Sequence, residues 1–247
     1  MNVPERGTLA LLLAFALAGC AESTIPQPPR LEIVSGDAQS GPIFLWPPDS
    51  LVVRATDAGG NPLVAWPIEW EIAERNGSIH PDTVLTDTAG VGRAKWVLGP
   101  KAGEQRVSAS VQGSNPVTFH AQADPGKVFV AVWRFSEGQQ PDTMRIHAVN
   151  PVYIEEARRG LEAGMSLNVG GPLIWGDGID PGWPYHFDPR LTRASDAGSV
   201  RSCAGVPPST EKEAERFGYT RSYCPFDLYL VRIEDVPEDY LAQLDSL

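Results

Sequence analysis

The chain has 247 residues and carries a formal net charge of −11 at pH 7, from 31 acidic and 20 basic side chains. This acidic balance excludes a protein whose main partner is nucleic acid, because binding to phosphates depends on patches of Lys and Arg. It also argues against direct adhesion to anionic lipid headgroups. Any affinity for a membrane therefore has to come from another source.

Residues 1–19 have the three parts of a secretory signal peptide: a short head containing Arg6, an apolar run from Leu9 to Ala18, and small residues before the cleavage point. A transmembrane anchor is the alternative, but a bilayer span needs about 20 apolar residues and this run is about half that length. The end of the region, Leu17-Ala18-Gly19-Cys20, resembles the lipobox of bacterial lipoproteins. In that family the cysteine receives a diacylglycerol and becomes the new N-terminus.

The lipobox resemblance implies a mature chain that starts at Cys20 and is held in the cell envelope by acyl chains such as palmitate. One acyl chain binds a membrane only marginally, so two or three chains make the anchor effectively permanent. Ala21 follows the cysteine, and the same resemblance then favours the outer membrane over the inner one. The covalent lipid is the only cofactor that we expect.

Residues 20–30 are polar and rich in proline, which favours an extended tether. From 31 to 123 the pattern changes to short runs of alternating apolar and polar residues separated by turn residues. This pattern predicts an all-β domain, an immunoglobulin-like β-sandwich of about seven strands. The alternation places Trp70 and Trp96 on apolar faces, so we expect both indoles in the core.

Several motifs of this segment occur in the order SGDAQ at 35–39, VRATD at 53–57, GNP at 60–62, TD at 86–87, LGP at 98–100 and AG at 102–103. In this order they resemble the bacterial immunoglobulin-like domains of the invasin and intimin type. The resemblance implies a rigid stalk or adhesion module without chemistry of its own.

Pro125 and Gly126 predict a short connector, after which strands and helices are mixed. Residues 127–247 therefore predict a small α+β domain. We expect strands at 128–135, 143–149, 167–175, 185–187 and 227–233, with helices at 151–163 and 210–217. Asn150 and Thr210 are the expected helix caps.

The two remaining cysteines, Cys203 and Cys224, form an even pair, which in an exported chain predicts a disulfide that staples the α+β domain. Closing a loop of about 20 residues would contribute roughly 3 kcal/mol to stability. A metal site would need further His or Cys ligands nearby, and a redox dithiol would need C-x-x-C spacing. The sequence around the pair has neither pattern.

Further motifs match a second family in order: Ala157-Arg158, Gly170, DPGWPYHFDP at 180–189 and Cys224-Pro225-Phe226. From about 127 to 236 the chain thereby resembles the N-terminal domain of the slime-mould calmodulin-binding protein family. Asn168 stands where a histidine is usual, and Phe226 replaces a tryptophan. The calmodulin link does not transfer, because a calmodulin target is a basic amphipathic helix and this acidic chain has none.

His186 and Asp188 are two residues apart on a predicted strand and so share a face. Such a pair can bind a metal, with His147 as a further ligand, or form an acid–base couple. The structural alternative is that His186 donates to a buried carboxylate or carbonyl, and that Asp188 caps a turn. A triad with Ser195, Ser199 or Ser202 has no nucleophile-elbow motif to support it.

Trp183, Tyr185, His186 and Asp188 form a candidate ligand surface, on which aromatic rings would stack against a sugar or a peptide. Aromatic residues at period two are more often part of a core. The loop at 176–180 contains two aspartates, but it lacks the ligand spacing of an EF-hand and is interpreted as a turn. We therefore assign no catalytic residue and no metal site.

Two classes of function remain. The favoured one is a non-enzymatic envelope lipoprotein, whose immunoglobulin-like stalk presents the α+β domain to a protein or glycan partner. The alternative is an envelope enzyme or metal-dependent protein with a site around His186, Asp188 and His147. An inhibitor or immunity protein would also have this size, but no reactive loop is visible in the sequence.

Overall fold

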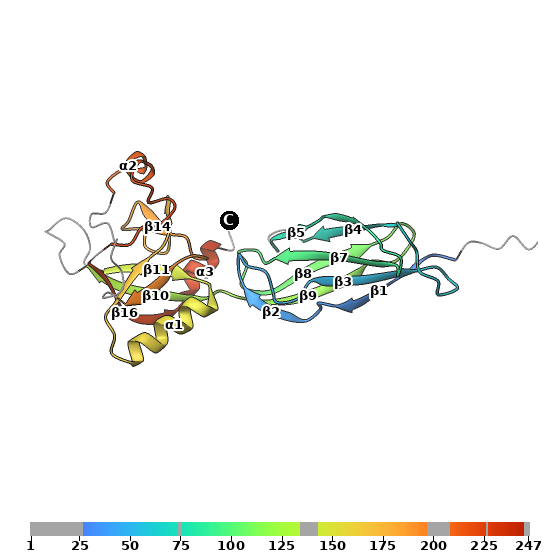
Figure 1. The fold of residues 1–247 in the computed structure, drawn as a ribbon, viewed down its shortest axis with the longest axis horizontal. Coiled ribbons are helices and arrows are strands. Elements are labelled where there is room, and N and C mark those ends of the chain that lie inside the picture. Colours follow the sequence, from blue (N-terminus) through green and yellow to red (C-terminus); the bar gives the residue numbers. More distant parts are fainter. Residues whose placement is uncertain (1–26, 74–75, 134–142, 197–207, 226, 245–247) are drawn as a thin grey trace, which may run out of the picture.

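The computed structural model describes residues 27–73, 76–133, 143–196, 208–225 and 227–244. The expected signal peptide, and with it Cys20, lies outside the described residues, as do Ser199, Ser202, Cys203 and Phe226. Figure 1 shows an elongated molecule in which a β-sandwich and an α+β body follow one another along the long axis. The chain enters the sandwich at the end remote from the α+β body.

Nine strands of the described chain form the two facing sheets of the sandwich. The first sheet is antiparallel and has the order β1 (Arg30–Ser35), β3 (Leu51–Thr56), β7 (Val91–Val97), β5 (Ser78–His80). The second has the order β2 (Gln39–Pro42), β9 (Val117–Asp124), β8 (Gly103–Ser110), β4 (Pro67–Ile72), β6 (Thr83–Leu85). Only β2, which runs parallel to β9, departs from the antiparallel pairing.

This strand order is that of an immunoglobulin-like fold. The four-stranded sheet corresponds to strands A, B, E and D, and β4, β8 and β9 correspond to C, F and G. The predicted immunoglobulin-like sandwich is therefore confirmed. Two strands are additional to these seven. The first is β2, which pairs with β9, and the second is β6, because the segment 78–85 pairs first with β7 and then with β4 and so crosses from one sheet to the other.

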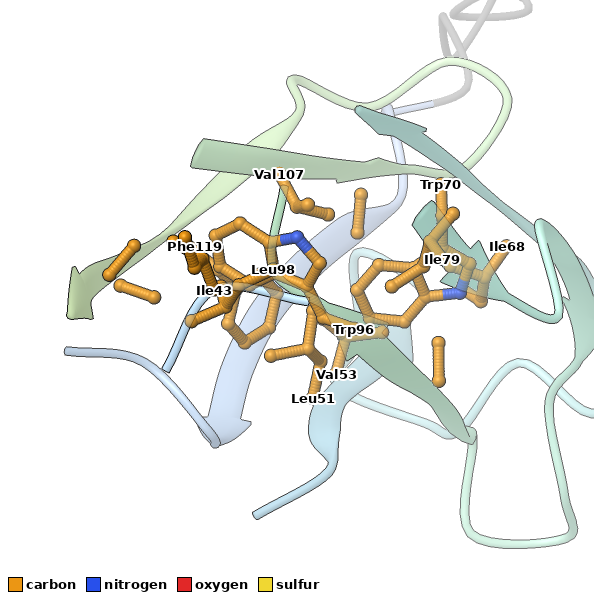
Figure 2. Close-up of a cluster of buried hydrophobic side chains, with 14 of the residues drawn as sticks. Ile43, Leu51, Val53, Ile68, Trp70, Ile79, Trp96, Leu98, Val107 and Phe119 are labelled. Carbon is orange, nitrogen blue, oxygen red and sulfur yellow. The ribbon is translucent and has the colours of Figure 1, made fainter. Parts of the chain in front are cut away.

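The core of the sandwich is filled by alternate side chains of the facing strands (Figure 2). Trp70 and Trp96, the two indoles expected there, are only 6% and 2% exposed. The rings of Trp70 and Phe119 lie 5.6 Å apart, and the indole N–H of Trp96 donates to the Asn76 carbonyl at 2.7 Å. Because the buried N–H of Trp96 has a partner, the ring is buried without the penalty of an unsatisfied donor.

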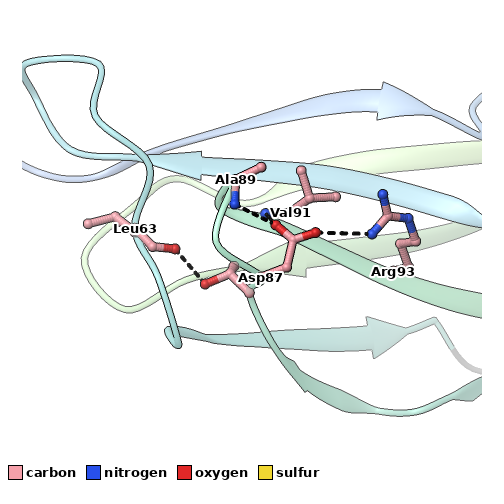
Figure 3. Close-up of polar contacts among 6 residues, drawn as sticks. Leu63, Asp87, Ala89, Val91 and Arg93 are labelled. Atoms are coloured by element: carbon pink, nitrogen blue, oxygen red, sulfur yellow. Dashed lines mark hydrogen bonds and ion pairs between the residues drawn. The ribbon is translucent and has the colours of Figure 1, made fainter.

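One carboxylate fixes the turn before β7 (Figure 3). An oxygen of Asp87 accepts from the backbone N–H groups of Ala89 at 2.8 Å and Val91 at 2.9 Å, and the other lies 3.4 Å from the Arg93 guanidinium. These bonds hold the pKa of Asp87 below its usual range, with the Val91 N–H the largest cause. The hydroxyl of the preceding Thr86 donates to the Leu63 carbonyl, which ties this turn to the loop before β4.

The α+β body is built on one antiparallel sheet. Its order is β11 (Thr143–Ala148), β10 (Lys127–Trp133), β16 (Leu228–Asp235), β12 (Leu167–Gly170), β15 (Arg193–Asp196). A hairpin of β13 (Leu173–Trp175) and β14 (Tyr185–Phe187) shares a hydrophobic cluster with this sheet. The strand expected at 167–175 is thus divided in two, because the chain leaves the sheet after Gly170 to form the hairpin.

The helix α1 (Pro151–Glu162) begins and ends as the sequence predicts. The side chain of Asn150 accepts from the N–H of Val152 at 3.0 Å, and Gly164 follows the helix with a φ of +70°. Ile154 and Ala157 pack into the hydrophobic cluster on the sheet. The helix thereby covers one face of the sheet.

The helix α2 (Glu211–Arg216) has the expected cap, since the hydroxyl of Thr210 accepts from the N–H of Glu213 at 3.2 Å. A third helix, α3 (Glu238–Leu244), is not among the elements expected from the sequence. Among the described residues, no helix combines the length and the apolar character needed to cross a bilayer.

The strand β10 is buried on both faces. Phe129 and Ala131 belong to the cluster that includes α1, whereas Val128 and Val130 form a second cluster with Val236. From α3, Tyr240 and Leu241 pack against both this second cluster and the sandwich core, and Leu244 is part of the sandwich core itself. The C-terminal helix therefore joins the two bodies by apolar contact, at the junction seen in Figure 1.

Only Pro125 and Gly126 separate β9 from β10. Gly126 has a φ of +83°, and a Cβ atom at this position would lie 2.2 Å from the carbonyl oxygen of Ala148. The N–H of Gly126 donates to the side chain of Asp124 at 2.8 Å. A glycine is thus needed for the connector to pass this close to β11.

Replacing Gly126 with alanine is expected to lower the free energy of unfolding by more than about 2 kcal/mol. The left-handed backbone alone costs a side chain roughly 1–2 kcal/mol, and the contact with Ala148 adds to this cost. Gly164→Ala is the matched control, because Gly164 has a φ of +70° and nothing within 4 Å of its Cβ position. Denaturant unfolding measures both; equal losses would show that the connector is not tightly packed.

Candidate functional site

His186 lies on β14, at the middle of the hairpin. Its Nδ1 is 3.3 Å from the Gly176 carbonyl, and its Cβ is so close to Gly178 that a side chain there would approach it to 2.5 Å. Burial lowers the pKa of His186, although the Gly176 carbonyl and nearby aspartates act in the opposite direction. The imidazole thus holds the loop 176–180 against the hairpin.

Asp188 follows the end of β14 and is only 5% exposed. Its carboxylate accepts from Arg190 at the backbone N–H (3.0 Å), Nε (2.9 Å) and Nη2 (2.7 Å). Burial alone would raise the pKa of Asp188, but the bonds from Arg190 lower it overall. The backbone carbonyl of Asp188 accepts from Thr192, so this residue organises a turn, as in the structural alternative.

His147 lies on β11 and is 3% exposed. Its Nε2 is 2.6 Å from the Pro125 carbonyl and therefore donates to it, and its ring meets that of Tyr240 edge-on at 5.3 Å. Burial lowers the pKa of His147, while the Pro125 carbonyl raises it to a lesser degree. This histidine belongs to the junction between the two bodies.

The three candidate ligands are thus engaged in separate contacts. In the described structure no hydrogen bond joins His186 to Asp188, and the described residues contain no group of three His, Cys, Asp or Glu side chains arranged to hold a metal. In the loop 176–180, Asp180 accepts from the backbone N–H groups of Arg145 and Gly182. Its carboxylate therefore satisfies protein donors.

The prediction that Trp183 and Tyr185 belong to a ligand-binding surface is wrong. Trp183 and Tyr185 are each 2% exposed and lie in the core, where Trp183 stacks on Trp133 at 5.8 Å. The physical reason is that the hairpin lays its apolar face on the sheet. Rings on that face have no access to a ligand in solution.

A cleft of about 670 Å³ lies between the two bodies, beside the connector. Its lining is largely apolar and includes Leu45, Trp46, Val149 and Ile154. The indole of Trp46 is 56% exposed, and the Lys95 ammonium lies 4.4 Å from its ring centre. The cleft therefore exposes apolar surface next to the junction of the two bodies.

A second, more polar pocket of about 310 Å³ lies at the β12–β15 edge of the sheet. Gly170 and Gly171 are part of its lining, and the backbone of Gly171 exchanges hydrogen bonds of 2.8 and 2.7 Å with Tyr223. A Cβ on Gly170 would lie 2.8 Å from the Tyr223 carbonyl, so glycine is needed for this approach. Arg193, Ser195, Arg221 and Ser222 form much of the wall.

No motif in the sequence marks the two arginines of this pocket, and the sequence suggested Ser195 only as part of a triad. Arg193 and Arg221 are 28 positions apart in the numbering and have no motif in common. The sequence signal that could have indicated the pocket was the pair Gly170 and Cys224. Both are motif residues of the second family resemblance, and the structure brings them into contact. Asn168, beside them, donates to the Pro225 carbonyl at 3.1 Å.

No protein-family model and no curated protein matches the chain. Among solved structures, domains 4 and 5 of the S-layer protein SbsC align with 13% identity and a TM-score of 0.29, covering 38% of this chain and 53% of that one, about half its length. The D0-D1 domain of intimin aligns with 12% identity and a TM-score of 0.30, covering 66% and 79%.

A C-terminal 282-residue fragment of intimin, solved in complex with the intimin-binding domain of the translocated intimin receptor, aligns with 12% identity and a TM-score of 0.31 over 78% of each chain. At these TM-scores the similarities carry no inference about fold or function. The assignment of the sandwich therefore rests on its own strand order, and membership of either family stays a prediction.

The protein is expected to lose stability as the pH falls below 6.5, the ordinary pKa of histidine, in part through His147. In the unfolded chain this imidazole takes up a proton near that pH, whereas the folded state, with its lowered pKa, does not; acid therefore favours unfolding by up to about 1.4 kcal/mol per pH unit. His147→Gln, which keeps a donor for Pro125, should reduce this dependence in denaturant titrations between pH 7 and 5. The exposed His80→Gln is the control, and an unchanged slope for H147Q would contradict the assignment.

Tyr185→Phe is expected to leave stability unchanged or to raise it by about 1 kcal/mol. The buried hydroxyl of Tyr185 has no hydrogen-bond partner among the residues that the structure describes, and removing an unsatisfied polar group removes its desolvation penalty. Tyr185→Ala, by contrast, should cost about 3–5 kcal/mol through loss of buried ring contacts. Thermal unfolding measures both variants, and a clear loss of stability in Y185F would reveal a partner for the hydroxyl.

Proposed function

We propose that the chain is a lipid-anchored protein of the cell envelope, in which Cys20 carries the acyl chains. The tether at 20–30 and the immunoglobulin-like sandwich form a stalk, which presents the α+β body to a protein or glycan partner. The single observation that supports this proposal is the arrangement along the long axis (Figure 1). An anchor at the N-terminal end would place the whole sandwich between the membrane and the α+β body.

The junction is built to keep that arrangement stiff. Domains joined in one chain move relative to each other by default, unless their interface is well packed and apolar. In this chain the connector has two residues, His147 is hydrogen-bonded to the Pro125 carbonyl, and Leu244 of α3 is part of the sandwich core. These contacts favour a stalk that holds the α+β body in a fixed orientation.

The proposed role is non-enzymatic, with the lipid as the only cofactor and with no nucleic-acid partner. Its support is that His186 and His147 bind backbone carbonyls, while Asp188 is satisfied by Arg190. The net charge of −11 disfavours phosphate backbones. Placement in the outer membrane and kinship with the invasin and slime-mould families belong to this proposal. The pairing of Cys203 with Cys224 belongs to it as well.

Lipidation can be tested with radiolabelled palmitate in a bacterial host. The wild-type chain should incorporate label and sediment with membranes, whereas Cys20→Ala should lose both properties, because the acyl chains on Cys20 are the proposed anchor and no described helix is long and apolar enough to cross a bilayer. Cys203→Ala is the control and should keep the label and the membrane association. A wild-type chain that is unlabelled and soluble, with an unmodified intact mass, would contradict the proposal.

A further inference from the structure

The polar pocket at the β12–β15 edge combines two cationic side chains with no acidic one. Arg193 and Arg221 both line it, and none of its described lining residues is Asp or Glu, in a chain with 31 acidic and 20 basic residues. Neither guanidinium forms an ion pair or a hydrogen bond with any described residue. Both side chains are therefore available to an anion that enters the pocket.

Guanidinium groups are suited to oxyanions because their planar fork donates two parallel hydrogen bonds to a carboxylate or phosphate. Two guanidinium groups in the lining of one pocket repel each other, and an anion bound in the pocket relieves that repulsion. Two backbone hydrogen bonds between Gly171 and Tyr223 hold this part of the pocket lining in place. The charge pattern thus points to an anionic ligand.

The remaining walls suit a ligand with several hydroxyl groups. Ser195 and Ser222 contribute hydroxyls that can donate and accept, and Tyr153 of α1 lies on the rim. Pro172 and Leu191, which is 48% exposed, offer apolar contact for a C–H face. The volume of about 310 Å³ is at the lower limit of small-molecule pockets, which suits one monosaccharide.

We propose that this pocket binds a carboxylate-bearing sugar residue, such as a uronic acid unit of an acidic polysaccharide. Arg193 and Arg221 pair with the carboxylate, and Ser195 and Ser222 bond to ring hydroxyls. A glycan is favoured over an acidic peptide because a single carboxylate side chain would leave the hydroxyl-lined part of the pocket unfilled. The inference rests on the proposed function, since it names the partner class that the α+β body would hold.

Calorimetric titration of the purified full chain with D-glucuronate tests the pocket. Wild type should bind saturably, and more weakly as salt is raised, because the pairing is between exposed charges. Arg193→Gln and Arg221→Gln should each weaken binding about tenfold or more, the effect of losing one charge-assisted pair. Arg159→Gln, on the exposed face of α1 and outside the pocket, is the matched control and should bind as wild type does. The melting temperatures of all three variants establish that they fold.

Titrations with other ligands test whether the pocket is specific for a carboxylate-bearing sugar. D-glucose lacks the carboxylate and acetate lacks the hydroxyls, so each should bind at least tenfold more weakly than D-glucuronate. Acetate or sulfate binding as tightly as D-glucuronate, or an acidic peptide binding in its place, would overturn the sugar assignment. Absence of saturable binding, or Arg→Gln variants that bind like wild type, would overturn the pocket itself. None of these results depends on the lipid, so a soluble, unlipidated native protein would contradict the display role alone.

Discussion

The structure depends on the two-residue connection between the last strand of the sandwich and the first strand of the α+β sheet. With only Pro125 and Gly126 between them, β10 begins beside the end of the sandwich, and the backbone approaches β11 too closely for any side chain at position 126. This approach leaves Val128 and Val130 on a face of the sheet that α1 does not cover. The C-terminal helix α3 closes that face and reaches into the sandwich core.

That closure determines the environment of His147. On an open sheet face the imidazole would be solvated, but between Tyr240 and the Pro125 carbonyl it is buried, and this burial lowers its pKa. His147, which was the expected third ligand of a metal site, therefore connects the two bodies through its contacts with Pro125 and Tyr240. Its ring nitrogen forms a hydrogen bond that holds the two bodies together. His186 likewise binds a backbone carbonyl, that of Gly176, and holds the loop of its own hairpin.

The opposite edge of the sheet has a different character. At β12 and β15 the glycines at 170 and 171 let the chain at 223–224 approach, and the resulting concavity is lined by arginines and hydroxyls. The proposed display role and the proposed anionic ligand are compatible in this geometry, because the apolar junction and the polar pocket lie at different places on the α+β body.

Local patterns were sufficient for the sandwich and for most elements of the α+β body. Period-two alternation determined the buried faces around Trp70 and Trp96, and Asn150 and Thr210 determined where helices begin, because alternation and capping act within a few residues. The tertiary structure alone decided that Trp183 and Tyr185 are core, that α3 spans the junction, and that Arg193 and Arg221 share a pocket. Each of these depends on which distant surface covers a side chain. Pro237 and the acidic Glu238-Asp239 pair that begin α3 are a local signal, but what the helix packs against is set by the closeness of the two bodies.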